Sequence, residues 1–160
     1  MDILFRTDEY VFSYRVAGIC IQKDKVLLQK PINDTAFAFP GGHVTFGETN
    51  EQTLSREFFE EIGVKISVGD LKWVGEVFFP WGNNQCHQIC LYYIVEITSD
   101  NIPWEGVFTG KEQIEGGNFN MEFHWVPLTE LKNIEIYPTN VVDLMDRIDS
   151  DGAQHFIYRE

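Results

Sequence analysis

Four of the five glutamates in one short segment of the chain, FPGGHVTFGETNEQTLSREFFEEIGV (residues 39–64), have a spacing that could support chemistry. They are Glu48, Glu57, Glu60 and Glu61. A Gly-Gly pair precedes them, and a further glycine follows the last of them. Hard divalent cations such as Mg²⁺ prefer several oxygen ligands in one place. The segment therefore raises the hypothesis of a divalent-metal site, and a plain solvated acidic surface is the competing interpretation.

The spacing of the apolar residues predicts a helix over residues 48–62. Leucine, phenylalanine and isoleucine recur at i, i+4 and i+8, which gives one buried stripe. Glu57, Glu60 and Glu61 are three and four positions apart, so they share the neighbouring face. Like charges at this spacing destabilise an isolated helix, and the helix dipole disfavours anions in its last turns. A local rule broken without local gain is typical of a functional site.

The composition indicates one folded domain. The chain has 160 residues, 44% of them hydrophobic, and a formal net charge of −13. Such an acidic chain is a poor candidate for binding nucleic acid, which requires basic patches. No stretch has the length of a transmembrane helix, so no membrane partner is expected. The first ten residues lack a basic region followed by an apolar run, so we expect no signal peptide.

The three cysteines also favour a cytoplasmic protein. Cys20 and Cys90 lie in apolar runs, where cysteine usually behaves as a small buried hydrophobe. Cys86 precedes a histidine, but a second Cys/His pair that would complete a zinc site is lacking. We expect reduced thiols in the core.

The remaining segments predict strands on either side of the helix. Alternation and β-branched residues favour a hairpin of two strands, followed by three later strands, a long polar connection and a terminal helix. The ranges are 15–21 and 25–30 for the hairpin, 71–79, 87–97 and 121–128 for the later strands, 99–120 for the connection and 138–148 for the helix. Thr45 or Thr49 could cap the first helix, and Gly63 would end it. We expect a mixed sheet between helices.

From Gly42 to Val64 the sequence reads G-x5-E-x7-R-E-F-F-E-E-I-G-V. It resembles the Nudix box, G-x5-E-x7-R-E-U-x-E-E-x-G-U, in which U is a bulky aliphatic residue. Phe58 occupies a U position with an aromatic ring, which affects local packing. The resemblance implies that residues 1–160 form a single Nudix hydrolase domain, an α/β/α sandwich with a central mixed sheet. It also implies metal-dependent hydrolysis of a nucleoside diphosphate linked to another group.

The resemblance also implies roles for individual residues. Glu57, Glu60 and Glu61 would bind Mg²⁺ or Mn²⁺, with the Gly41 carbonyl as a further ligand. Glu48 and Gly42 would support the site, and Arg56 would pair with a carboxylate and orient it. A general base would come from the box or from a later loop, where the candidates are Glu112, Glu115 and Glu122. We favour Glu112, since WEGVFTGKEQ resembles the acidic loop of MutT-type enzymes.

Two features bear on the substrate. YPTNVV (137–142) resembles the MutT-type segment that reads a purine base, which would place Asn140 on the base; a helix cap is the competing role. Phe79 and Trp81 lie near a turn where a base could stack, although core packing competes. We therefore expect a small nucleotide as substrate, favouring a purine nucleoside triphosphate. The alternatives are an ADP-ribose or nucleotide-sugar pyrophosphatase and a non-catalytic nucleotide sensor. We expect the protein to be a monomer or a homodimer.

Overall fold

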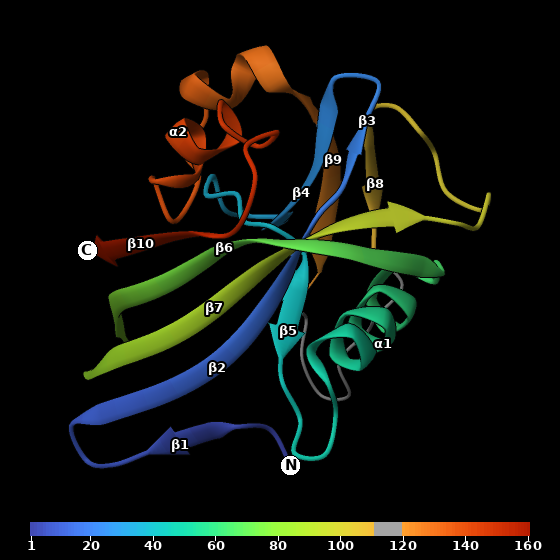
Figure 1. The fold of residues 1–160 in the computed structure, drawn as a ribbon. Helices are drawn as coiled ribbons and strands as arrows, with labels where there is room; N and C mark the ends of the chain where they lie inside the picture. The colour runs from blue at the N-terminus through green and yellow to red at the C-terminus, as the bar shows by residue number, and fades with distance from the viewer. Residues whose placement is uncertain (111–119) are drawn as a thin grey trace.

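Within residues 1–110 and 120–160, which the computed structural model describes, the chain forms two sheets, two α-helices and one 3-10 helix (Figure 1). The strands are β1 (Leu4–Arg6), β2 (Tyr10–Ile19), β3 (Ile21–Gln22), β4 (Lys25–Pro31), β5 (Gly41–His43), β6 (Ile66–Trp81), β7 (Asn84–Ile97), β8 (Val107–Thr109), β9 (Met121–Pro127) and β10 (Gln154–Arg159). The helices are α1 (Asn50–Ile62), the 3-10 helix η1 (Leu128–Asn133) and α2 (Val141–Met145).

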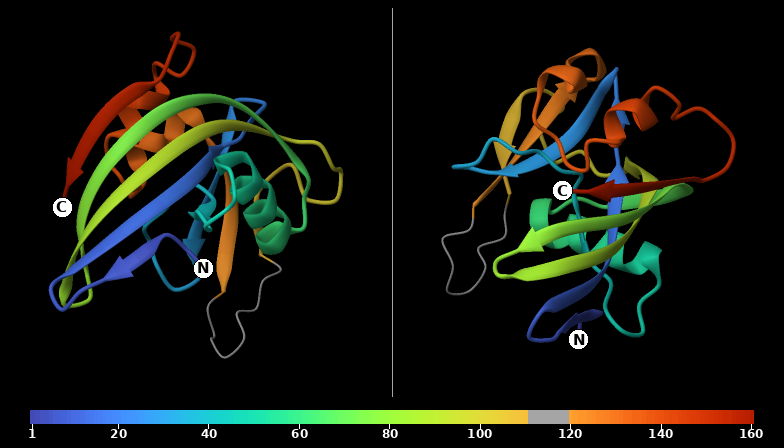
Figure 2. Two further views of the ribbon diagram at one scale, coloured as in Figure 1. Left: turned by 60° about the horizontal axis from the view of Figure 1, so that its bottom comes forward. Right: turned by 90° about the vertical axis from the view of Figure 1, so that its left-hand side faces the viewer.

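The larger sheet is mixed and has the strand order β1-β2-β7-β6-β10, with β5 paired to β2 beside it. Strand β2 runs parallel to β7 and β10 runs parallel to β6, whereas β6 and β7 are antiparallel. The smaller sheet is antiparallel in the order β3-β4-β9-β8. In Figure 2 the larger sheet curves over η1 and α2, while α1 lies beside β9. The predicted α/β fold, with a mixed sheet between helices, is confirmed.

Two hydrophobic cores lie on opposite faces of the strands. Successive side chains of a strand point to opposite faces, and in β2 the neighbours Val16 and Ala17 belong to different cores. The same holds for Leu27 and Leu28 in β4. One core is shared with α1 and the other with α2. The helices therefore cover opposite faces, which gives the layered arrangement.

The predicted hairpin of residues 15–21 and 25–30 is wrong in its first strand. Strand β2 ends at Ile19 and pairs with β7 in the larger sheet, whereas β3 begins at Ile21 and pairs with β4 in the smaller one. One apolar run thus serves two sheets. Periodicity detects an extended chain but carries no information about which strand it will pair with.

Other boundaries differ as well. The predicted strand 71–79 is part of the longer β6, and the terminal helix predicted over 138–148 is α2, which is only five residues long. Strand β8 lies within the range predicted as the connection 99–120. No strand is predicted over residues 154–159, where β10 lies; this strand pairs in parallel with β6, far away in sequence.

All three cysteines are buried free thiols, so the predicted burial of Cys20 and Cys90 is confirmed. Burial raises the pKa of the Cys20 thiol to about 12 and that of Cys90 to about 11. Burial also raises the pKa of Cys86. These thiols are therefore protonated near neutral pH. No helix in the described part of the chain is long and apolar enough to cross a membrane.

Candidate active site

Helix α1 carries the glutamates, and its two ends are fixed by local sequence. Thr49 caps the start: its Oγ1 accepts a hydrogen bond from the Gln52 backbone N–H (3.2 Å), and the Gln52 side-chain oxygen accepts one from the Thr49 N–H (2.8 Å). Of the two predicted caps, Thr49 is the one observed and Thr45 is not. Gly63 ends the helix with φ of 71°, a conformation that glycine adopts without steric cost. The glutamates in the last turns are therefore held at defined positions.

The Gly-Gly pair brings strand β5 against both β2 and α1. Gly41 pairs with Ala17, and Gly42 pairs with Val16. A Cβ on Gly41 would lie 2.0 Å from the Val16 carbonyl oxygen, and one on Gly42 would lie 2.2 Å from the Glu57 carboxyl carbon. The space that a side chain would need is thus occupied by the β2 backbone at Gly41 and by the Glu57 carboxylate at Gly42.

Arg56 holds three carboxylates at once. Its Nε and Nη2 atoms donate to the two carboxylate oxygens of Glu48 at 2.9 and 3.0 Å. Its Nη1 atom donates to Glu57 at 2.8 Å and to Glu60 at 3.3 Å. The Thr53 hydroxyl donates to Glu48 at 2.8 Å. A planar guanidinium has several N–H donors in a fixed arrangement and can bond all three carboxylates, which a lysine could not do.

These contacts change the proton affinity of the carboxylates. Hydrogen bonds from Arg56, and then from Thr53, lower the pKa of Glu48. Burial raises the pKa of Glu57, and the contacts with Arg56 oppose that rise. Burial therefore disfavours the charged form of Glu57, and a cation bound nearby would offset this cost.

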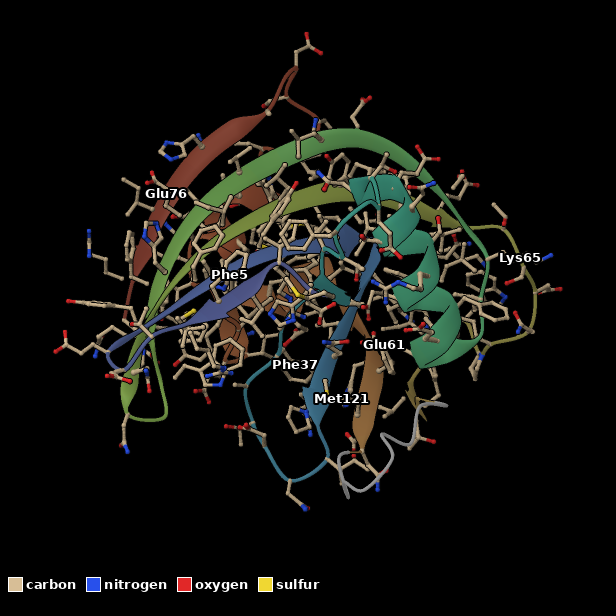
Figure 3. All side chains as sticks on the ribbon, turned by 90° about the horizontal axis from the view of Figure 1, so that it is seen from below. Phe5, Phe37, Glu61, Lys65, Glu76 and Met121 are labelled. Carbon is tan, nitrogen blue, oxygen red and sulfur yellow. The ribbon has the colours of Figure 1, made fainter. Side chains whose placement is uncertain are left out.

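Glu57 and Glu61 line a cleft of about 560 Å³ together with the Gly-Gly pair. Figure 3 shows Glu61 on the side of α1 that faces β9, with Met121 of that strand nearby. The described residues that line this carboxylate cleft are Asp2, Arg15, Gln29, Gly41, Gly42, His43, Glu57, Glu61, Trp81, Gly110, Met121 and Phe123. Glu60 is absent from this lining; 43% of its side chain is exposed and its carboxylate lies against Arg56.

The donor atoms of the cleft fit a hard divalent cation. The Glu57 and Glu61 carboxylates and the Gly41 backbone carbonyl supply oxygen ligands, which Mg²⁺ and Mn²⁺ prefer. Gly42 has no side chain, so the Glu57 carboxylate can lie directly over β5. The described residues do not already form a cluster of three His, Cys, Asp or Glu side chains arranged as ligands. Glu60 could join the other two after leaving Arg56.

Arg15 extends from strand β2 into the carboxylate cleft, next to Gly41. Its Nη2 atom donates to the Gly41 carbonyl oxygen over 3.4 Å, so the predicted carbonyl ligand faces a guanidinium. Arg15 is half-buried and forms no ion pair with any residue in the described ranges. A guanidinium in this situation is well suited to a phosphate group.

A second cavity, of about 500 Å³, opens next to the cleft and is rich in aromatic side chains. Arg15 and Gln29 line both cavities, so they mark the junction between them. We call this cavity the aromatic pocket; its described lining is Arg15, Ala17, Gln29, Asp34, Ala36, Ala38, Phe39, Val77, Phe79, Gln88, Cys90, Tyr92, Tyr137, Pro138, Tyr158 and Glu160.

Two of the three residues predicted to contact the substrate line these cavities. Phe79 lines the aromatic pocket and Trp81 lines the carboxylate cleft, with their rings stacked at 6.1 Å between centroids. Asn140 is not part of either lining. Its amide nitrogen donates to the Ile157 carbonyl of β10 at 3.2 Å, and its side chain makes no capping hydrogen bond to α2.

Of the three candidates for a loop base, only Glu122 lies within the described residues. Glu112 and Glu115 lie outside the described residues. Glu122 lies on β9 between Met121 and Phe123, which line the carboxylate cleft, so its side chain points to the other face of the strand. There its carboxylate lies 3.3 Å from Lys30 and 2.9 Å from His124. Hydrogen bonds from His124, and then from Lys30, lower its pKa.

Several residues of the junction and the pocket are not among those predicted from the sequence. Arg15 is a polar residue at the start of the apolar run RVAGICI, and Gln29 is one near the end of KVLLQK. Such a residue in a buried strand needs a partner or a function, and this signal could have identified both. Tyr158 had no comparable signal, because the fold alone brings it to the pocket, whereas Tyr137 begins the segment YPTNVV that the resemblance already links to the base.

Together, the fold and the site define a layered α/β protein in which a cleft lined by carboxylates lies beside an aromatic pocket. The chain belongs to the Nudix family: the family model described as the NUDIX domain matches residues 12–145.

Individual relatives agree with this family. A Mycobacterium tuberculosis protein that bears the name MutT4 is 31% identical over 124 residues, which cover 72% of this chain and 45% of that protein. An ADP-ribose pyrophosphatase of Methanocaldococcus jannaschii is 35% identical over 85 residues, 51% of this chain and 49% of that one. The chain thus spans about half the length of these two relatives. The MutT protein structure from Methanosarcina mazei has the same fold, with a TM-score of 0.59 and 21% identity over 90% of this chain and 96% of that one.

Proposed function

We propose that this chain is a divalent-metal-dependent pyrophosphohydrolase that cleaves a diphosphate bond in a nucleoside diphosphate linked to a further group. We favour a purine nucleoside triphosphate, which would yield a nucleoside monophosphate and pyrophosphate. The observation that carries this proposal is the junction: a cleft with carboxylates and a pocket with aromatic rings share the side chains of Arg15 and Gln29. A nucleotide has the matching order of diphosphate, pentose and base.

Each part of the site has a task in this reaction. Glu57, Glu60, Glu61 and the Gly41 carbonyl would hold the ion, while Arg56 and Glu48 keep the carboxylates oriented. When bound, Mg²⁺ or Mn²⁺ would neutralise phosphate oxygens and lower the pKa of a water molecule. Loss of a hydrogen bond that orients a metal ligand commonly lowers metal affinity or activity by about 10–100-fold. For the general base we retain Glu112, which is a proposal from the sequence alone.

The pocket would hold the base by stacking and apolar contact. Phe79 belongs to its lining, and Trp81 lies beside it over the carboxylate cleft. Both positions fit the predicted contacts with a substrate. A role of Asn140 in reading the base stays a prediction; it requires the amide to leave the Ile157 carbonyl. The buried free thiols also fit a reducing compartment, the cytoplasm.

An ADP-ribose or nucleotide-sugar pyrophosphatase is the second candidate, since one relative bears the name ADP-ribose pyrophosphatase. The two candidates differ in their products. A nucleoside triphosphate gives pyrophosphate, whereas ADP-ribose gives AMP and ribose 5-phosphate. A panel of nucleotides with Mg²⁺, analysed for these products, separates them. Binding without any product would support the non-catalytic sensor instead.

We expect hydrolysis to depend on a divalent ion. Excess EDTA should abolish turnover, and Mg²⁺ or Mn²⁺ should restore it, because the carboxylate cleft supplies oxygen donors for a cation and the bound ion would neutralise the phosphate oxygens. The metal should also raise the Tm, provided that it binds the folded state in preference. Undiminished turnover in excess chelator would contradict this mechanism.

We expect Arg15→Gln to weaken substrate binding. Its guanidinium is the cation shared by the cleft and the pocket, so its loss should raise KM by about tenfold or more, as for other charge-assisted phosphate contacts. Mn²⁺ affinity without nucleotide should stay the same or increase, because the guanidinium that faces the Gly41 carbonyl also repels a cation there. Kinetics and a Mn²⁺ titration measure the two effects separately. Parallel losses in both would indicate that Arg15 only supports the local structure.

A further inference from the structure

Gln29 is the most deeply buried polar side chain at the junction of the two cavities. Only 6% of its surface is exposed, and it lines both the carboxylate cleft and the aromatic pocket. Its side-chain oxygen Oε1 is fully buried and accepts no hydrogen bond from any residue in ranges 1–110 and 120–160. Buried polar atoms of native proteins are nearly always paired, so an acceptor left open here points to a partner that is not part of the protein.

The backbone of Gln29 is firmly held. Its N–H donates to the Ala38 carbonyl and its carbonyl accepts from the Ala38 N–H, both at 2.8 Å. On its other side it pairs with Phe123 of β9. The side chain therefore leaves a fixed point of the sheet, and the open acceptor is a defined feature of the junction.

The neighbouring Gln88 shows the difference. It also lines the aromatic pocket, but its Oε1 accepts a hydrogen bond from the Ser13 hydroxyl at 3.2 Å. Two glutamines thus line one pocket, and of their side-chain oxygens one is satisfied within the protein and the other is not.

We propose that Gln29 is a specificity-determining residue that accepts a hydrogen bond from a pentose hydroxyl of the substrate. This inference rests on the proposed function, since it takes the substrate to be a nucleotide. The pentose joins the base to the phosphates, so it must lie between the aromatic pocket and the carboxylate cleft, where Gln29 and Arg15 are. At this junction the Arg15 guanidinium can bind a phosphate group, and the Gln29 side-chain oxygen can accept a hydrogen bond from a donor of the substrate. The hydroxyls are the donors that a pentose offers.

The test uses Gln29→Met, which keeps a similar shape and removes the acceptor. Wild-type protein should bind a non-hydrolysable 2′-deoxynucleotide or ribonucleotide at least about tenfold more tightly than the 2′,3′-dideoxy analogue, since a site built to bond a hydroxyl rejects its absence. In Gln29→Met this ratio should fall to about one. The Tm of the ligand-free variant should equal or exceed that of the wild type, because a buried unpaired polar atom is removed.

Gln88→Met is the matched control. It removes an oxygen that Ser13 already satisfies, so the ligand-free protein should lose stability, and the ratio between hydroxyl-bearing and dideoxy ligands should stay at its wild-type value. A wild-type ratio in Gln29→Met, or equal binding of all analogues by the wild type, would overturn the role of Gln29. Because binding is measured without turnover, that result leaves hydrolysis untouched. Absence of nucleotide hydrolysis by the wild type would instead remove the proposed function.

Discussion

Glu61→Gln is expected to lower kcat by more than about 100-fold while the protein stays folded. Loss of an outer contact to a metal ligand usually costs about 10–100-fold, and Glu61 lines the carboxylate cleft itself. The amide keeps the shape of the side chain but removes the charge that would hold the ion. Steady-state kinetics at saturating Mg²⁺, with circular dichroism as a check on folding, measures the effect.

Stability gives an independent readout for the same variant. Glu61 lies in the last turn of α1, where the helix dipole disfavours a negative charge, and four positions after Glu57. In metal-free protein, Glu61→Gln should therefore leave the Tm unchanged or raise it slightly, whereas the rise in Tm on adding Mn²⁺ should shrink. Glu51→Gln changes an exposed residue in the first turn of the same helix; it is the matched control and should keep the wild-type kcat and metal response. A near-wild-type kcat in Glu61→Gln would indicate that the acidic face of α1 is only a solvated surface.

The sequence was sufficient for features that are determined locally. Helix α1 carries its own cap at Thr49 and its own stop at Gly63, and its buried stripe follows from a spacing of 3.6 residues. The placement of three glutamates on one face follows from the same geometry. These features depend on contacts within about one helical turn, so a single sequence contains the information that specifies them.

The junction and the aromatic pocket could not be predicted in the same way. Arg15 and Tyr158 come from β2 and β10 of the larger sheet and Gln29 from β4 of the smaller sheet, and only the tertiary fold brings them together. The sequence also does not indicate which of the glutamates contact Arg56 and which line the cleft. Arg56 was expected to orient one carboxylate, and the structure shows it in contact with three, one of which is the exposed Glu60.

Gly42→Ala is expected to reduce activity as strongly as the loss of a carboxylate, although it changes no charged residue. The new methyl group would lie 2.2 Å from the Glu57 carboxyl carbon, so that carboxylate has to move away from the cleft. Displacement of a catalytic group by about 1 Å can cost about 100-fold in rate, and we expect a loss of kcat of at least that size. The clash involves the end of a flexible side chain, so the Tm should change little.

Two further glycine variants make this result specific. In Gly41→Ala the methyl group meets the Val16 carbonyl oxygen at 2.0 Å, and because backbone cannot move aside, the Tm should fall clearly. In Gly69→Ala on β6 the nearest atom lies 3.5 Å away, so both Tm and kcat should stay near their wild-type values. If Gly42→Ala retains full activity, the position of the Glu57 carboxylate over β5 does not matter for hydrolysis. Loss of activity at an unchanged Tm would instead show that the second glycine is required because it leaves room for a carboxylate, whereas the first is required by the backbone of β2.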